Sequence, residues 1–332
     1  MSIRNLDALF SPQSVAVFGA SERPGSVGAT VWRNLRQDFS GQVFGVNHKH
    51  SHIDGVPVYA SAADLPAVPD LAVICTPAAS VPGLIEELGR LGTRAAVVVT
   101  AGLDKAQKQR MLDAARRHTL RILGPNCIGM LVPHWGLNAS FAHIGATKGD
   151  IAFVSQSGAL VTAMLDWAGS RGIGFSHFVS LGEHADVDFG DLLDYLGSDP
   201  RTRAILLYIE SIESPRKFMS AARACARNKP VLVVKAGRSA QGQQAAASHT
   251  GALAGNDKIY EDVLRQSADL FMASIEHKGL EIYVEVDPAL PRKLMPRLQQ
   301  LVNRAQLTEE ELHILRGIAR AVAAGGQSGR VD

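Results

Sequence analysis

A histidine in a segment of small residues could carry the most demanding chemistry in this sequence. His249 lies in Ser248-His249-Thr250-Gly251, after a stretch rich in Gly, Ser, Gln and Ala. An accessible imidazole can accept a phosphoryl group on a ring nitrogen. Glu210, at the end of a predicted strand over 204–209, could orient that imidazole. Glu213 is a local competitor for this role, or a charge at a helix N-terminus.

A second feature suited to anions is Ser155-Gln156-Ser157-Gly158. It follows a predicted strand over 151–154 and opens a predicted helix over 158–170. Hydroxyls and free N–H groups converge at such a helix start, whereas an ordinary N-cap serine would use only one of them. The likeness to a G-x-S-x-G nucleophile elbow is partial, because Val154 takes the first glycine position. The pattern therefore favours anion binding over serine hydrolysis.

The segment from Gly19 to Gly28 predicts a phosphate site of the nucleotide type. It follows a predicted strand over 14–18 and opens a predicted helix over 27–37. Glycines let the backbone approach a ligand closely, and a helix N-terminus attracts phosphate. The glycines that would allow this approach are Gly19, Gly25 and Gly28.

The end of the next predicted strand, over 42–46, argues against a nicotinamide dinucleotide. No carboxylate stands there to bind a ribose hydroxyl, and the glycine spacing differs from G-x-G-x-x-G. Asn47 and Lys49 follow instead, and a lysine at this place suits an additional phosphate. Thr76 and Pro77 end the third predicted strand, and ligands gather at the carboxyl ends of parallel strands.

Gly124-Pro125-Asn126-Cys127 forms a rigid bend after the last strand of the first half. The Asn126 side chain can bond to backbone or to a ligand. Cys127 has no evident base beside it, so we interpret it as a small packed residue rather than a nucleophile. With Cys75 and Cys225 it makes three scattered cysteines without a C-x-x-C, which indicates neither a metal site nor a disulfide framework and fits a reducing compartment.

These motifs need a scaffold, and an alternation of strands and helices predicts two α/β domains in series, each with a parallel sheet. Continuous apolar runs over 71–76 and 95–100 are typical of strands covered on both faces. The stretch over 132–149 has no clear period and is expected to be a linker. From residue 267 onward the regular alternation of strands and helices ends. A possible strand over 280–286 and two predicted helices over 291–303 and 309–323 follow.

Composition excludes several classes of partner. A length of 332 residues suits two domains of about 150 residues each. Lys and Arg number 34 against 32 Asp and Glu, and aromatic residues make up 6%, so neither nucleic acid nor a membrane surface is indicated. No apolar run reaches the roughly 20 residues of a membrane helix, and no signal peptide is apparent. We expect a cytoplasmic protein.

Taken together, the motifs resemble the NDP-forming acyl-CoA synthetases, the superfamily of succinyl-CoA synthetase and ADP-forming acetyl-CoA synthetase. The resemblance covers about residues 5 to 266 and follows the order of the family's α-subunit. It implies an α/β fold with a Rossmann-like CoA-binding domain over 1–131 and a linker over 132–149. A flavodoxin-like ligase domain with the phosphohistidine loop would span 150–270, and a divergent helical tail 271–332.

The resemblance also implies a reversible reaction, acid + CoA + ATP = acyl-CoA + ADP + phosphate. The family's phosphorylated histidine falls on His249 and its partner glutamate on Glu210, while the helix start at 155–158 would steady the phosphohistidine. CoA would lie against the glycine-rich turn, and Asn126 and Cys127 would be nearer its thiol. The further CoA contacts implied are Ser21, Arg23, Lys49, Thr76 and Pro77.

Two departures from the family pattern bear on the partners. We expect no ATP-grasp domain in this chain, so ATP, ADP and Mg would be bound by a separate ATP-grasp β-type subunit in an oligomer. The tail does not match the family, and Ala101 stands where some members place a glutamate near CoA. The acid is expected to be acetate or another short-chain acid. One alternative is a non-catalytic CoA- or acyl-CoA-binding regulator. Another is an NAD-dependent oxidoreductase, and the absence of a ribose-binding carboxylate argues against it.

Overall fold

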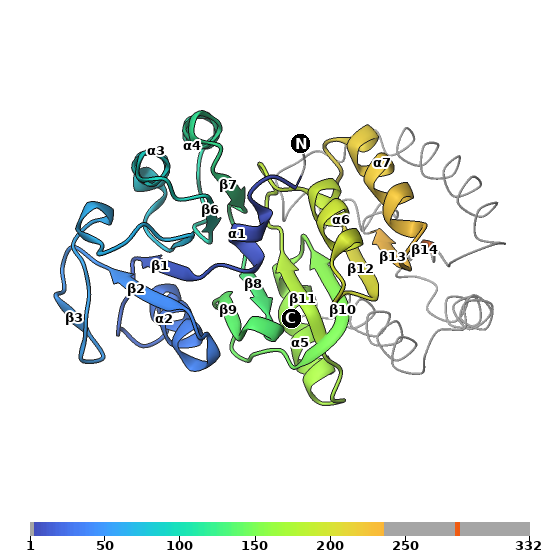
Figure 1. The fold of residues 1–332 in the computed structure, drawn as a ribbon, viewed down its shortest axis with the longest axis horizontal. Helices are drawn as coiled ribbons and strands as arrows, with labels where there is room; N and C mark the ends of the chain where they lie inside the picture. Colours follow the sequence, from blue (N-terminus) through green and yellow to red (C-terminus); the bar gives the residue numbers. More distant parts are fainter. Residues whose placement is uncertain (1–2, 236–282, 286–332) are drawn as a thin grey trace, which may run out of the picture. The chain divides into compact units, whose positions relative to one another are not determined.

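The computed structural model describes residues 3–235 and 283–285. The chain divides into two compact units. Unit 1 comprises Met1–Gly149 and Phe175–Asp188, and unit 2 comprises Asp150–Gly174 and Phe189–Asp332. Each unit contains parallel strands joined by helices (Figure 1). The predicted α/β class, with a Rossmann-like sheet followed by a flavodoxin-like one, is confirmed.

Unit 1 is built on a parallel sheet in the order β2-β1-β5-β6-β7. Four of these strands are almost wholly buried, as their continuous apolar sequences require. All five carboxyl ends therefore lie at one edge of the sheet. The strands are β1 (Ser14–Phe18), β2 (Gln42–Val46), β5 (Leu71–Ile74), β6 (Ala95–Val98) and β7 (Arg121–Leu123).

Three helices connect these strands, α2 (Val27–Asp38), α3 (Val81–Leu91) and α4 (Lys105–His118). Helices α3 and α4 pack against each other and share one apolar cluster with the sheet (Figure 1). Local sequence starts α4, because Asp104 and Gln107 form a reciprocal capping box. A short helix, α1 (Leu6–Phe10), precedes β1.

The rest of unit 1 is made of short antiparallel strands. β3 (His52–Ile53) pairs with β4 (Val56–Pro57), and β8 (Gly129–Val132) pairs with both β9 (Leu137–Ser140) and β11 (Phe175–Ser180). Three 3-10 turns complete it, η1 (Ala62–Asp64), η2 (Ala78–Ser80) and η3 (Pro133–Trp135).

Unit 2 has parallel strands in the order β14-β13-β12-β10. Helices α6 and α7 pack together, with the rings of Phe189 and Phe218 in edge contact 6.4 Å apart. The strands are β10 (Lys148–Ser155), β12 (Ala204–Ile209), β13 (Val231–Lys235) and β14 (Tyr283–Glu285), and the helices are α5 (Gly158–Gly169), α6 (Phe189–Ser198) and α7 (Pro215–Ala226).

The structure differs from the expectation at two places. The segment expected as a linker over 132–149 contains η3, β9 and the start of β10, because strands this short are held by pairing and leave no helical period in the sequence. In addition, β11 and the loop after it group with unit 1 although the chain reaches them after β10 and α5.

The small-residue stretch before His249 and the predicted helices over 291–303 and 309–323 lie outside the described residues. The possible strand over 280–286 contains β14. Among the described helices, none has the length and apolar character to cross a membrane.

Candidate functional site

In unit 2, one glutamine side chain joins two of the predicted site segments. Gln156, at the start of α5, accepts hydrogen bonds on Oε1 from the main-chain N–H groups of Glu210 (2.6 Å) and Ser211 (3.0 Å). Its Nε2 donates to the Ser211 hydroxyl at 3.2 Å, and its own N–H donates to the carbonyl of Tyr208. The helix start and the end of β12 are therefore held together, with Glu210 at the junction.

The serine hydroxyls of this helix start are bonded to main chain. Ser155 is fully buried, and its Oγ donates to the Ser157 carbonyl and accepts from the Ser157 N–H, both at 3.1 Å. The Ser157 Oγ caps the helix by accepting from the N–H of Leu160. The groups suited to an anion are then the first N–H groups of α5, at Gly158 and Ala159, which have no intrahelical acceptor.

Glu210 is half-buried beside an aromatic hydroxyl. Burial, together with the negative charge of Glu210, raises the pKa of Tyr208 to about 12, so its phenol stays protonated at neutral pH. Glu213, the competing carboxylate, lies on an exposed stretch just before α7 and is not bonded by Gln156. The hydrogen bonds of Gln156 thus hold Glu210, and not Glu213, next to the start of α5. His249 lies outside the described residues.

In unit 1, the glycine-rich turn and α2 approach each other more closely than any side chain would allow. A Cβ on Gly28 would lie 1.9 Å from the carbonyl oxygen of Gly19. Asn47 holds the turn from the neighbouring strand end, with Nδ2 donating to the Ala20 carbonyl and Oδ1 accepting from the Lys49 N–H, each at 2.8 Å. The Asn47 amide therefore supports the turn.

The same corner of unit 1 carries two exposed cations. Arg23 follows Ser21, whose hydroxyl accepts the Arg23 N–H at 3.0 Å. Lys49 lies just beyond β2. Among the described residues, no carboxylate forms an ion pair with either cation. Positive charge without a protein partner beside a helix N-terminus is suited to phosphate groups. Gly25 is exposed within this turn.

The next two strand ends are linked through threonine hydroxyls. The Thr100 hydroxyl donates to the carbonyl of Thr76 at 2.7 Å, and the Thr76 hydroxyl accepts from Ser80 at 2.9 Å. Pro77 is exposed and begins the turn that carries Ser80. The predicted contacts Thr76 and Pro77 thus lie at the carboxyl edge of the sheet, beside the glycine-rich turn.

The bend after β7 presents an asparagine and buries a cysteine. Asn126 is exposed, and its main-chain N–H donates to the carbonyl of Thr100 at 3.0 Å. Cys127 is only 4% exposed, and burial raises the pKa of its thiol to about 12. Burial and the neighbouring Cys127 raise the pKa of the Cys75 thiol to about 12 as well. Both thiols are neutral near pH 7, as the interpretation of Cys127 as a packed residue requires.

A loop that contacts this bend was not predicted from the sequence. Glu183 follows β11, and its N–H donates to the carbonyl of Pro125 at 2.9 Å. Its carboxylate binds Lys108 of α4 at 2.6 Å and the Asn126 Nδ2 at 3.3 Å. The available signal was the position of Glu183 shortly after a strand, because ligands in open α/β sheets bind at the carboxyl ends of strands.

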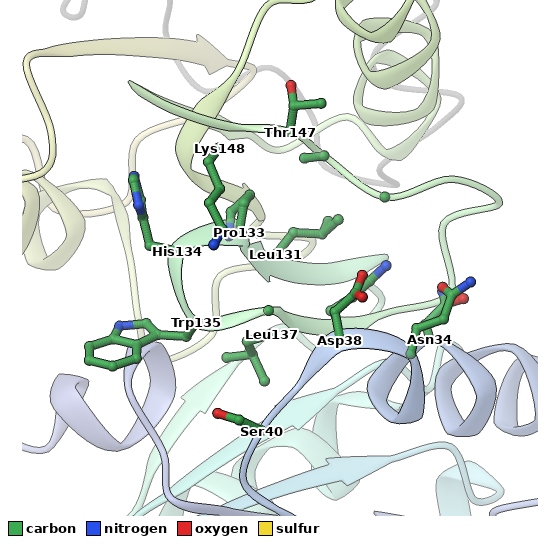
Figure 2. A pocket seen from close by; sticks show the side chains of 15 residues that line it. Asn34, Asp38, Ser40, Leu131, Pro133, His134, Trp135, Leu137, Thr147 and Lys148 are labelled. Atoms are coloured by element: carbon green, nitrogen blue, oxygen red, sulfur yellow. The ribbon is translucent and has the colours of Figure 1, made fainter.

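A hollow in unit 1 lies away from this edge. It has a volume of about 590 Å³ and is lined by the end of α2, the β8–β9 hairpin and residues 145–148. Figure 2 shows His134 and Trp135 on one side, and Asn34 and Asp38 from the helix on the other. The His134 Nε2 donates to the carbonyl of Gly149 at 2.8 Å. No residue predicted for the site lines it.

Comparison with known proteins relates each unit to a described domain family. A family model described as a CoA binding domain matches residues 13–133, and one described as a succinyl-CoA ligase like flavodoxin domain matches 148–277. A third, the C-terminal domain of the tRNA methyltransferase TrmJ, matches 278–330. The chain therefore carries a CoA-binding domain followed by a succinyl-CoA ligase-like domain.

The curated relatives agree with this domain pair. The chain is 44% identical over 277 residues to an ADP-forming acetate–CoA ligase I of Archaeoglobus fulgidus, covering 82% of this chain and 40% of the relative. It is 40% identical to the α-subunit of ADP-forming acetate–CoA ligase II of Pyrococcus furiosus, covering 82% and 60%. The chain belongs to the NDP-forming acyl-CoA synthetase superfamily, as the motifs predicted.

A solved structure of a similar protein agrees with this family assignment. An acetyl-coenzyme A synthetase 1 of Ca. Korarchaeum cryptofilum, in complex with phosphate and ADP, superposes with a TM-score of 0.74 at 39% identity. The match covers 79% of this chain and 58% of that one. The chain thus spans about two fifths to three fifths of the length of these relatives.

Proposed function

We propose that this chain is the CoA-binding α-type part of an NDP-forming acyl-CoA synthetase, which catalyses acid + CoA + ATP = acyl-CoA + ADP + phosphate. The observation that carries the proposal is the Gln156 bridge, which holds an anion-binding helix start against the strand end that bears Glu210. A phosphohistidine needs both an acceptor site for its phosphate and a partner for its ring. Relatives named as ADP-forming acetate–CoA ligases support the reaction class.

His249 would carry the phosphoryl group. Its ring nitrogen attacks the γ-phosphorus of ATP, forming an N–P bond as the bond to ADP breaks. Glu210 accepts the hydrogen bond of the other ring nitrogen and so keeps the attacking nitrogen unprotonated. The N–H groups at the start of α5, next to Ser155, Gln156, Ser157 and Gly158, stabilise the phosphate charge. The substrate carboxylate then attacks phosphorus, giving an acyl phosphate and free His249.

CoA would complete the reaction at the carboxyl edge of unit 1. Its phosphates would lie against the α2 N-terminus with Arg23 and Lys49. Its thiol would lie near Asn126 and Cys127. The sulfur attacks the acyl carbon, the C–O bond breaks, and phosphate leaves. The other contacts would come from Gly19, Ser21, Gly25, Gly28, Asn47, Thr76 and Pro77.

The reaction also requires a nucleotide site and a carboxylic acid. Relatives named as α-subunits support a partner subunit. This would be an ATP-grasp β-type subunit that binds ATP, ADP and Mg, and the two would form an oligomer in the cytoplasm. The acid would be a short-chain carboxylate, with acetate the first to test because several relatives are named as acetate–CoA ligases.

The test is phosphoryl transfer from labelled ATP to this chain in an extract of its host. Wild type should acquire an acid-labile label, His249→Ala should acquire none, and Glu210→Gln should be labelled more slowly. Glu213→Gln is the matched control, because it removes an exposed carboxylate three residues away, and it should behave as wild type. Label on His249→Ala would refute the role of the histidine. No label on wild type, in an extract that labels a known α-subunit, would favour a CoA-binding regulator.

A further inference from the structure

The loop after β11 is registered on the Asn126 bend by main-chain contacts. Glu183 and Ala185 donate their N–H groups to the carbonyls of Pro125 and Gly124, at 2.9 and 3.0 Å. Gly182 has a φ of +56°, and a Cβ there would lie 2.4 Å from the carbonyl oxygens of both Pro125 and Asn126. The loop therefore has little freedom to slide, and it delivers the Glu183 carboxylate to one place.

The Glu183 carboxylate has two partners of different kinds. Its Oε2 accepts from the Lys108 ammonium at 2.6 Å, and its Oε1 accepts from the Asn126 Nδ2 at 3.3 Å. Lys108 and Glu183 are each about one third exposed, so water only partly screens the pair. The capping box at Asp104 fixes the first turn of α4, on which Lys108 stands. The lysine thus holds the carboxylate in position.

This arrangement decides which end of the Asn126 carboxamide is available. An ionised carboxylate only accepts hydrogen bonds, so the amide nitrogen must face Glu183. The Asn126 backbone is also held, with a φ of +56° and its N–H bonded to Thr100. The amide oxygen has no hydrogen-bond donor among the described residues. What the exposed side chain offers to a ligand is an acceptor.

We infer that Lys108, acting through Glu183, positions the Asn126 carboxamide so that its oxygen accepts a hydrogen bond from a neutral donor at the thiol end of CoA. The donor is either the thiol S–H or the N–H of the amide nearest to it in CoA. Each of these groups is a neutral hydrogen-bond donor. Lys108 and Glu183 are positioning residues. The inference rests on the proposed CoA site and adds to it a preference for a hydrogen-bond donor over a carboxylate at this position.

The decisive variant is Glu183→Gln. The Lys108 ammonium only donates hydrogen bonds, so it bonds to the oxygen of the introduced glutamine. The glutamine NH₂ group then faces Asn126. The Asn126 amide then rotates to accept, and its nitrogen faces the ligand. Losing one neutral hydrogen bond and opposing two donors should weaken CoA binding about tenfold. The unfolding temperature should change little, because every group keeps a partner.

A double variant separates positioning from a purely structural role. In Lys108→Met/Glu183→Gln the glutamine oxygen is free to accept from Asn126, and the amide returns to its original orientation. Binding of CoA should then recover at least threefold relative to Glu183→Gln alone. Lys105→Met, which removes an exposed lysine one turn earlier on α4, is the matched control and should bind as wild type.

The measurement is the dissociation constant of CoA and of desulfo-CoA by titration calorimetry on the full chain, with unfolding temperatures in parallel. An equal loss of both ligands in Glu183→Gln assigns the donor to the amide N–H, and a loss for CoA only assigns it to the thiol. Unchanged binding by Glu183→Gln, or a double variant weaker than the single one, overturns the relay while the CoA site stands. Failure of wild type to bind CoA overturns both.

Discussion

The close approach of Gly28 to the carbonyl of Gly19 predicts opposite effects on stability for two glycine-to-alanine substitutions in unit 1. In Gly28→Ala the new Cβ would stand 1.9 Å from the carbonyl oxygen of Gly19, and real Cβ contacts essentially never fall below 3.0 Å. The start of α2 or the turn must therefore move by about 1.1 Å, the difference between those distances. Both are held, the turn by Asn47 and the helix by its packing on β1 and β2.

The size of the effect follows from comparison with a free site. Overpacking against a backbone that cannot yield costs about 3 kcal/mol, which lowers an unfolding midpoint by roughly 6–12 °C for a unit of this size. Gly83→Ala, in α3, meets no atom within 4 Å. It should raise stability by about 0.5–1 kcal/mol, because alanine is the better helix former.

The assay is thermal unfolding followed by tryptophan fluorescence in a Trp167→Phe background. The two remaining tryptophans, Trp32 and Trp135, then report on unit 1 alone. Gly28→Ala should also weaken CoA binding by more than tenfold, since the shift occurs where the phosphates are proposed to lie, whereas Gly83→Ala should bind as wild type. A Gly28→Ala variant that melts at or above the wild-type temperature would refute the close approach.

Three further predictions concern groups whose environment the structure defines. Gln156→Ala leaves the N–H of Glu210 without its acceptor and should destabilise unit 2 by about 1–3 kcal/mol, as measured by urea unfolding. It should also slow phosphorylation in the labelling assay. Normal labelling would exclude a role for the Gln156 bridge. Burial raises the pKa of Cys75 and Cys127 to about 12 and of Cys225 to about 11. These thiols should resist iodoacetamide at pH 8 in the folded chain. Because the pKa of each thiol is higher in the folded than in the unfolded chain, the contribution of the thiols to stability is complete below about pH 9. It is lost as the pH rises to about 11 for Cys225 and to about 12 for Cys75 and Cys127, by about 1.4 kcal/mol per pH unit for each thiol. Flat alkaline stability would contradict this. Burial raises the pKa of Asp70, but hydrogen bonds from Arg94, Gln13 and Ser14 outweigh it and lower the pKa overall. Asp70→Asn should therefore reduce the loss of stability below about pH 4, seen as a smaller acid shift in unfolding temperature.

The sequence by itself determined the elements and the edges where function would gather. Strands over 14–18, 42–46 and 204–209 were predicted with the bounds that the structure has, and the helix over 27–37 to within one residue. Buried parallel strands are continuous apolar runs, and amphipathic helices with capping residues are local patterns, so both can be read without knowing the fold. The collinear order of the motifs was enough to predict the superfamily.

Only the tertiary structure decided which side chains meet at those edges. Gln156 reaches Glu210 across 54 positions, and Lys108 reaches Glu183 across 75. Periodicity shows that a strand ends, but the path of the loop that follows depends on contacts with distant carbonyls, such as those of Pro125 and Gly124. The short strand β9 was missed for the same reason, because its pairing partner β8 holds it in place rather than its own four residues.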